Sequence, residues 1–220
     1  AGVWRWYGDL SVSTTEDYYF GFYNYGAYLW DTIAYAAPYY LIVKSAGNDR
    51  DDALPGTQNN QHQVWNGGWV NSSTPRPADC PTGYDCISTN GNAKNILTVG
   101  AVDDIPGGWS QPSDVVMSAF SGWGPTDDGR IKPDLVGNGI GLYSSYSGSN
   151  TQYSGSNGTS MSAPNVTGSL ALIQEHHKNL TGNFLRSSAL KGLAIHTTDE
   201  AGITGNLDLD AAIANTTSIS

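Results

Sequence analysis

Apolar side chains recur at every fourth position in one early segment of the chain. Leu29, Ile33 and Ala37 follow this spacing, which predicts a helix over residues 27–37 with these three side chains on its buried face. Pro38 ends the pattern, because the residue before a proline avoids the helical conformation. An amphipathic helix therefore stands near the start of the chain.

Continuous apolar runs follow, and runs of this kind are typical of strands buried on both faces. They predict strands at 39–44, 95–102 and 115–119. Helical patterns return at 160–177 and 185–195, whereas 49–94 and 120–158 are rich in turn-forming residues. Alternating strands and helices predict a single α/β domain over residues 1–220 with a mostly parallel sheet.

Charge and composition narrow the class of partner. The 220 residues include 20 acidic and 10 basic side chains, a net charge of −10, which argues against nucleic acid or an anionic membrane surface. No apolar stretch reaches the roughly 18 residues that a membrane-spanning helix needs. A sequence poor in charge but rich in Asn, Ser, Thr and Gly favours a secreted or extracellular protein.

The chain has two cysteines, Cys80 and Cys86, in a turn-rich segment. A disulfide between them is expected in an oxidising compartment, and a pair of free thiols is the alternative. Two cysteines alone do not supply the four ligands of a structural zinc site. We assign no metal-ligating residue.

Ser160 stands where a glycine-containing loop meets the start of a predicted helix. A helix N-terminus offers unpaired N–H groups and the positive end of the helix dipole. A serine there is either an ordinary helix cap or a nucleophile whose reacting carbonyl oxygen meets those N–H groups. The residues alone leave both interpretations open.

A wider pattern favours the nucleophile. The run Gly-Thr-Ser-Met-Ser-Ala-Pro at 158–164 resembles the nucleophile signature of the subtilisin-like serine peptidases, the subtilases. Asn165 stands where the family often has His. This resemblance implies that Ser160 is the nucleophile of a peptidase acting on proteins or peptides, with Gly158 beside the substrate. It also implies a three-layer αβα subtilisin-like fold.

Other segments resemble the same family in the same order. The run Ser-Ala-Gly-Asn at 45–48 is similar to its oxyanion loop, with Asn48 as side-chain donor. Ser45, Ala46 and Gly47 would then form one wall of the specificity pocket. Residues 95–103 and 118–134 resemble the stretches that precede the nucleophile, and Gly-Asn-Gly at 137–139 replaces the usual Ala-Pro-Gly.

Two parts of the family's catalytic triad have no counterpart in these residues. The family's Asp lies in Asp-Ser/Thr-Gly and its His in His-Gly-Thr-His, and neither motif occurs. Asp31 falls on a helix that we assign to packing. No histidine is followed by glycine; the four are His62, His176, His177 and His196. We therefore expect an N-terminally truncated, inactive fragment whose partner is the missing N-terminal part of the same protein.

Several alternatives stay open. Peptide-bond hydrolysis by this family requires no cofactor. Structural Ca²⁺ and simple solvation are competing interpretations of the acidic clusters at 49–52, 103–104 and 127–128. A pseudopeptidase that binds extended peptides is the first rival function. A carbohydrate-binding module is the second, indicated only by aromatic residues scattered along the sequence, among them Trp4, Trp6, Trp65 and Trp69.

Overall fold

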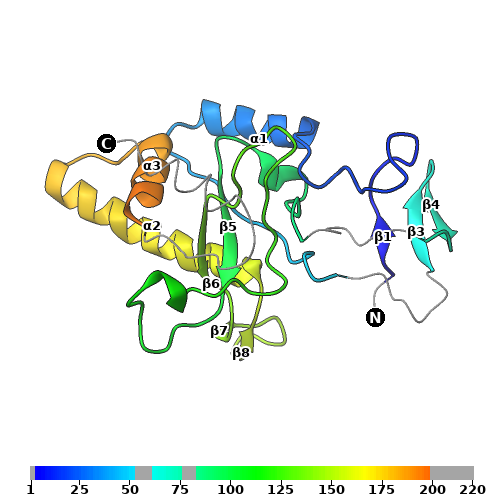
Figure 1. Cartoon of the computed structure of the whole chain (residues 1–220). Coiled ribbons are helices and arrows are strands. Elements are labelled where there is room, and N and C mark those ends of the chain that lie inside the picture. The colour runs from blue at the N-terminus through cyan, green and yellow to red at the C-terminus, as the bar shows by residue number, and fades with distance from the viewer. Residues whose placement is uncertain (1–2, 53–60, 76–82, 199–220) are drawn as a thin grey trace.

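The computed structural model describes residues 3–52, 61–75 and 83–198 (Figure 1). Its central sheet contains three parallel strands in the order β2-β5-β6. These strands are β2 (Val43–Ser45), β5 (Leu97–Val102) and β6 (Leu135–Asn138). All six residues of β5 are buried, as expected for the middle strand of a covered parallel sheet.

Helices cover both faces of this sheet. They are α1 (Tyr25–Ala36), α2 (Thr159–Thr181) and α3 (Ser187–Thr197). Side chains alternate along β5, so Leu97 and Val99 pack with α2 and α3, whereas Ile96, which precedes the strand, packs with Ala27 of α1. Figure 1 shows α1 and α2 on opposite sides of the sheet. The predicted αβα layering is confirmed.

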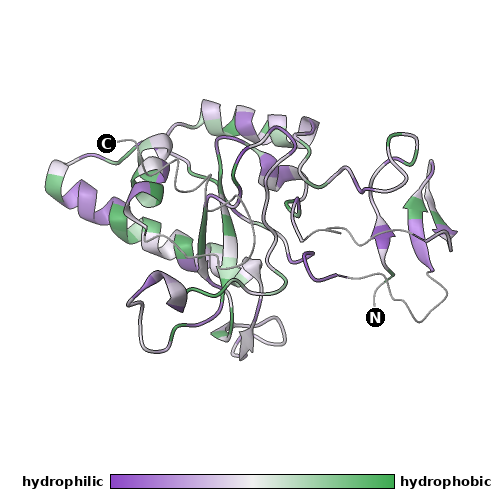
Figure 2. Cartoon of the chain, viewed as in Figure 1, coloured by the Kyte–Doolittle hydropathy of each residue, from purple (hydrophilic) through white to green (hydrophobic). Residues whose placement is uncertain are grey.

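The predicted buried face of the first helix is wrong. Leu29 and Ile33 are 42% and 52% exposed, and Ala27, Asp31 and Ala34 are buried instead. Both sets have helical spacing, and Figure 2 shows hydrophobic and hydrophilic residues intermixed along α1. The side facing the rest of the protein is fixed by Asp31, whose carboxylate accepts hydrogen bonds from two backbone N–H groups of the segment before β5.

Two predicted strands also differ. The apolar run at 39–44 contributes only its end to β2, which is three residues long. Residues 115–119 form no strand, only an isolated bridge between Met117 and Val102, next to the 3₁₀ helix η2 (Pro112–Asp114). The third strand is β6, within a stretch predicted to be turns. Gly137 interrupts the apolar pattern of this strand, so the pattern did not predict it. Glycine is needed at this position because it lies so close to α2 that a Cβ would meet Val166 at 2.8 Å.

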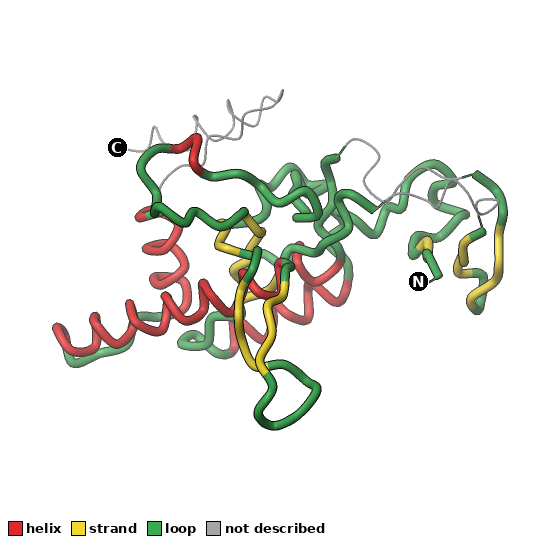
Figure 3. Tube along the Cα trace, turned by 90° about the horizontal axis from the view of Figure 1, so that it is seen from below, coloured by secondary structure: helices red, strands yellow, loops and turns green. Residues whose placement is uncertain are grey.

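The long polar excursion contains structure that its sequence did not reveal. Strands β3 (His62–Trp65) and β4 (Trp69–Ser72) form an antiparallel hairpin, and β1 (Arg5–Trp6) joins β3 in parallel. The 3₁₀ helix η1 (Thr89–Asn92) follows. This second sheet lies at one end of the molecule, well apart from the start of α2 in both views (Figures 1 and 3).

A second hairpin leads directly into α2. Strands β7 (Leu142–Ser145) and β8 (Tyr153–Ser156) pair antiparallel, and their connecting loop projects from the molecule (Figure 3). None of the described helices is long and apolar enough to span a membrane.

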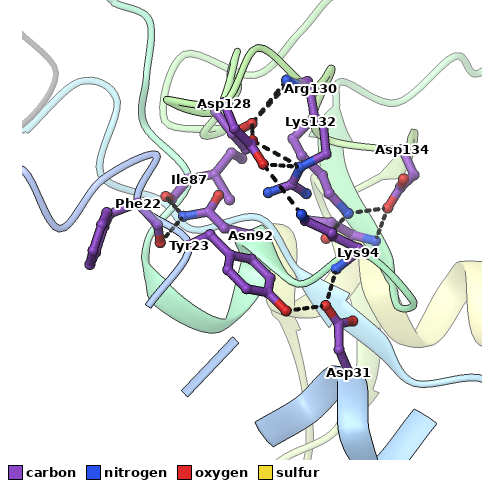
Figure 4. A network of polar contacts seen from close by, with 12 residues as sticks. Phe22, Tyr23, Asp31, Ile87, Asn92, Lys94, Asp128, Arg130, Lys132 and Asp134 are labelled. Atoms are coloured by element: carbon purple, nitrogen blue, oxygen red, sulfur yellow. Dashed lines mark hydrogen bonds and ion pairs between the residues drawn. The ribbon is translucent and has the colours of Figure 1, made fainter. Parts of the chain in front are cut away.

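Buried charges tie the sheet to α3. The Asp134 carboxylate accepts a hydrogen bond from Thr98 N at 2.6 Å and contacts the ammonium groups of Lys132 and Lys191 at 2.7 and 2.9 Å (Figure 4). Lys132 is almost fully buried, and this burial lowers its pKa to about 8 although Asp134 favours its charged form. The network therefore fixes the segment that enters β6.

Candidate active site

Ser160 occupies the first turn of α2 and is exposed. Gly158, two residues earlier, caps the helix with φ +145°, a conformation that favours glycine. The N–H groups of Met161 and Ser162 both donate to the Gly158 carbonyl. The Ser160 N–H makes no hydrogen bond to any residue that the structure describes, so it remains available as a donor.

Asn48 approaches this helix start from the loop after β2. Its Oδ1 accepts two hydrogen bonds from Thr159, one from the backbone N–H at 2.9 Å and one from the hydroxyl at 2.8 Å. The Thr159 hydroxyl in turn accepts a hydrogen bond from Gly47 N at 3.2 Å. Because its oxygen is held twice, the Asn48 amide has a fixed orientation that leaves Nδ2 as its free donor.

The two nitrogens border one small region of space. An ideal Cβ built on Gly158 would lie 3.4 Å from Asn48 Nδ2 and 3.7 Å from Ser160 N. Glycine leaves this position free of a side chain, so a polar atom can approach both nitrogens. An arrangement of this kind is suited to stabilising the oxyanion of a tetrahedral intermediate beside a serine hydroxyl.

Tight packing holds the start of α2 against the sheet. The buried Ser162 hydroxyl lies 2.6 and 2.9 Å from the carbonyl oxygens of Gly100 and Gly137. Gly158 N donates to the Gly139 carbonyl at 2.8 Å, and a Cβ on Gly139 would collide with Ala101. The glycines at 137–139 thus allow the close approach of β6 to the helix that carries Ser160.

Ser45, Ala46 and Gly47 lie where the sequence places them, at the carboxyl end of β2 and next to Asn48. Ala46 is buried, and the Gly47 carbonyl accepts a hydrogen bond from Gly122 N at 3.0 Å. The Ser45 hydroxyl accepts one from Lys44 Nζ at 3.0 Å. Their role as a wall of the specificity pocket, like that of Gly158, stays a prediction.

The histidines lie away from Ser160. His176 and His177 follow it on α2 by sixteen and seventeen residues, about 24 Å at the rise of an α-helix. His196 is in the last turn of α3. His62 is buried in β3 against the edge of Trp4. That none of them acts as the general base stays a prediction.

The side chain of Asp31 is held by hydrogen bonds within the fold. Its carboxylate accepts hydrogen bonds from the Tyr23 hydroxyl at 2.7 Å and from the backbone N–H groups of Lys94 and Asn95 at 3.0 and 2.6 Å (Figure 4). These contacts dock α1 onto the segment before β5. Asp31 therefore serves packing, as its position on a helix predicted.

Three of the acidic side chains are held by hydrogen bonds. Asp103 and Asp104 accept hydrogen bonds from Ser118 and Asn138, and Asp128 from Arg130. Within the three described ranges, no group of three or more His, Cys, Asp or Glu side chains is placed to hold a metal ion. Structural Ca²⁺ and simple solvation both stay interpretations of the acidic loops.

Cys86 is buried and disulfide-bonded. Cys80 lies outside the described residues, so the pairing itself stays a prediction. Thr159 is the site residue that sequence reasoning missed. Its position in the motif was visible, but its contact with Asn48 links residues 111 positions apart and has no local signal.

Comparison with known proteins identifies the family. Residues 13–212 match the model of the subtilase family, Peptidase_S8. A C5a peptidase of Streptococcus pyogenes serotype M3 (strain ATCC BAA-595 / MGAS315) is 36% identical over 102 residues, which are 46% of this chain and 8% of that protein. Serine protease AprX of Bacillus subtilis (strain 168) is 32% identical over 107 residues, 43% of this chain and 24% of AprX. The matches thus span small parts of these longer relatives.

The fold has solved counterparts. The self-cleaved protease domain of PatA superimposes with a TM-score of 0.53 at 18% identity, over 90% of this chain and 57% of that one. The CspB protease of Clostridium perfringens is 27% identical with a TM-score of 0.46, over 58% of this chain and 25% of that one. The PatA likeness bears on the fold alone.

Proposed function

Since the chain belongs to the subtilase family of serine peptidases, we propose that it is the nucleophile-bearing part of an endopeptidase that cleaves peptide bonds through an acyl-enzyme at Ser160. The observation that carries this proposal is the double hydrogen bond from Thr159 to Asn48 Oδ1, which leaves Asn48 Nδ2 free next to Ser160 N. A helix cap or a peptide-binding surface has no need of that arrangement.

The proposed reaction has two halves. The Ser160 hydroxyl oxygen attacks the carbonyl carbon of the scissile bond, and its proton passes to a general base. The carbonyl oxygen becomes an oxyanion that accepts hydrogen bonds from Ser160 N–H and Asn48 Nδ2. Collapse of this intermediate breaks the C–N bond, and the protonated base supplies the proton of the leaving amine. Water then attacks the acyl-Ser160 ester and releases the second product.

The general base and its orienting carboxylate come, in this proposal, from a part of the protein outside these 220 residues. A serine hydroxyl without a base is a weak nucleophile. In another member of this family, loss of the triad histidine alone lowers kcat by about 10⁶, a magnitude taken from that relative rather than from this structure. The 220 residues alone are therefore expected to be inactive, as one portion of a catalytic domain.

The uncovered edge of the sheet supports this view. Among the described strands, β2 pairs only with β5, and its other edge has no partner. The neighbouring helix α1 exposes apolar side chains, including Tyr25, Leu29 and Ile33. Additional parallel strands beside β2 would cover both features. The disulfide at Cys86 is in keeping with a secreted peptidase.

The experiment compares the 220-residue chain with the polypeptide extended through the upstream coding sequence, using an internally quenched peptide library as substrate. We expect cleavage only by the extended polypeptide and loss of cleavage in its Ser160→Ala variant. Cleavage by the 220 residues alone would contradict the proposal that essential groups are missing. An extended polypeptide that binds peptides but cleaves none would favour a pseudopeptidase.

A further inference from the structure

We propose that one face of the β1-β3-β4 sheet binds carbohydrate, namely a short stretch of a neutral polysaccharide. The register of the sheet places six side chains on this face, two from each strand or its extension. They are Arg5, Tyr7, Gln63, Trp65, Trp69 and Asn71, and together they are called the aromatic face below. The opposite side of the sheet carries the buried Trp6, His62 and Val64.

Three aromatic rings that are distant in sequence gather on the aromatic face. The ring of Trp69 contacts Tyr7 and Trp65, each with a centroid separation of 5.4 Å and close to perpendicular. Tyr7 and Trp65 are 53% and 50% exposed, so both rings present area to solvent. Exposed rings held by their neighbours lose little entropy on binding and offer apolar area to the C–H faces of sugars.

A row of polar side chains runs beside the rings. Arg5 Nε donates to Gln63 Oε1 at 3.2 Å, and Gln63 Nε2 donates to Asn71 Oδ1 at 3.4 Å. The Arg5 guanidinium also lies over the Trp69 ring, 4.9 Å from its centroid. These contacts pre-order side chains that still have N–H donors and carbonyl oxygens to offer. Amide and guanidinium groups next to aromatic rings match the mixture of hydroxyls and C–H groups on a sugar.

Charge and size favour a glycan over a protein partner. The aromatic face has one positive charge and no carboxylate, although the whole chain carries −10. Strands β3 and β4, of four residues each, are about 13 Å long, and three strands are about 10 Å across. A surface of these dimensions suits a short oligosaccharide segment.

The structure gives the scattered tryptophans a shared location that the sequence did not indicate. Along the sequence they are scattered, and a binding role had little support. The fold brings Trp65 and Trp69 together with Tyr7 on a sheet that stands apart from the start of α2 (Figure 1). Binding at the aromatic face does not depend on the proposed peptidase reaction, and it would hold the protein to a polysaccharide surface.

Affinity electrophoresis tests the proposal with the extended polypeptide in gels containing xylan, galactomannan, laminarin or dextran. We expect at least one polysaccharide to retard the chain. Trp65→Ala should weaken that retardation about tenfold or more, as for truncation of an aromatic anchor. The matched control is Tyr143→Ala, which removes an exposed ring of the β7–β8 hairpin. This control and Ser160→Ala should migrate as the parent chain does.

The replaced aromatic side chains are exposed, so we expect each variant to fold like the parent chain. Far-UV circular dichroism checks this. Absence of retardation in all four gels would overturn the proposal. Equal retardation of the parent and Trp65→Ala would do so as well. Concentration-dependent dimerisation that Trp65→Ala abolishes would instead identify the aromatic face as a contact between two copies. None of these results bears on cleavage by Ser160, so the two proposals fail separately.

Discussion

Thr159 holds Asn48 through the same oxygen twice, with its backbone N–H at 2.9 Å and its hydroxyl at 2.8 Å from Asn48 Oδ1. The residue next to the proposed nucleophile thus orients the side chain proposed to stabilise the oxyanion. These two hydrogen bonds join the loop after β2 to the start of α2, where the negative charge of the oxyanion would develop. A change at Thr159 should therefore affect the transition state more than substrate binding.

Replacement of Thr159 by valine tests this coupling in the extended polypeptide. The variant keeps the backbone donor but loses the hydroxyl, so Asn48 is less firmly oriented. We expect kcat to fall roughly tenfold, the equivalent of one net hydrogen bond, with KM little changed. Thr167→Val removes a hydroxyl bonded within the same helix, to Ala163 O, and should leave kcat unchanged. A change confined to KM would contradict the assigned role.

Stability should depend on pH through Asp85. Burial, together with the charges of Asp127 and Glu16, raises the pKa of the Asp85 carboxyl to about 6. The folded state therefore binds this proton more tightly than the unfolded state, in which the pKa is near 3.8. Its contribution to stability is fully present below about pH 4 and is lost as the pH rises through 6.

Asp85→Asn should consequently raise the free energy of unfolding near pH 7.5 and flatten its decline between pH 4 and 7, as measured by urea denaturation. Asp9→Asn is the control, because hydrogen bonds from Ser11 lower the pKa of that exposed carboxyl and keep its titration below this window. If both variants retain the parent's slope, Asp85 is not the group that titrates.

The buried charge network gives a third prediction. Asp134→Ala leaves the Lys132 ammonium buried with the Thr98 hydroxyl, at 3.0 Å, as its one remaining partner among the described residues. Stranding a buried charge costs about 3–5 kcal/mol of unfolding free energy. Asp128→Ala breaks the ion pairs with Arg130 and Lys94, in which the acid is 41% exposed, and should cost about 1 kcal/mol or less. Equal losses in the two variants would contradict the distinction between buried and exposed pairs.

A fourth prediction concerns the corrected face of α1. Ile33 is half exposed, so Ile33→Ala should change the free energy of unfolding by about 0.5 kcal/mol or less. The adjacent Ala34 is buried, and Ala34→Leu should destabilise by about 1–3 kcal/mol through overpacking. The reverse order, with Ile33→Ala the costlier change, would restore the face that the sequence alone predicted.

Sequence reasoning was most effective where the signal was local. Ser160 and Asn48 could be proposed as site residues because each stands in a short motif at a junction between a regular element and a loop, and their roles stay predictions. The strand at β5 was clear because all of it is buried. The wrong face of α1 arose because Leu29 and Ile33 have the same helical spacing as the residues that are buried. The third strand escaped because Gly137 hides its apolar pattern.

Contacts between distant residues were beyond the sequence. The bond between Thr159 and Asn48 needs the loop after β2 and the start of α2 to meet. The aromatic face needs Tyr7 of the first strand's extension to reach Trp69 of the hairpin. Neither contact follows from residue type or spacing, because both are produced by the packing of the whole chain.

Labelling of the extended polypeptide with a fluorophosphonate, followed by mass spectrometry of its peptides, is the decisive test of Ser160 as the nucleophile. We expect a single adduct on Ser160. In Asn48→Ala we expect labelling to be slower by about 10² to 10³, the loss known for the equivalent donor in another member of this family. An adduct on a different residue, or a labelling rate that does not depend on Asn48, would contradict the assignment of Ser160 as the nucleophile beside this oxyanion site.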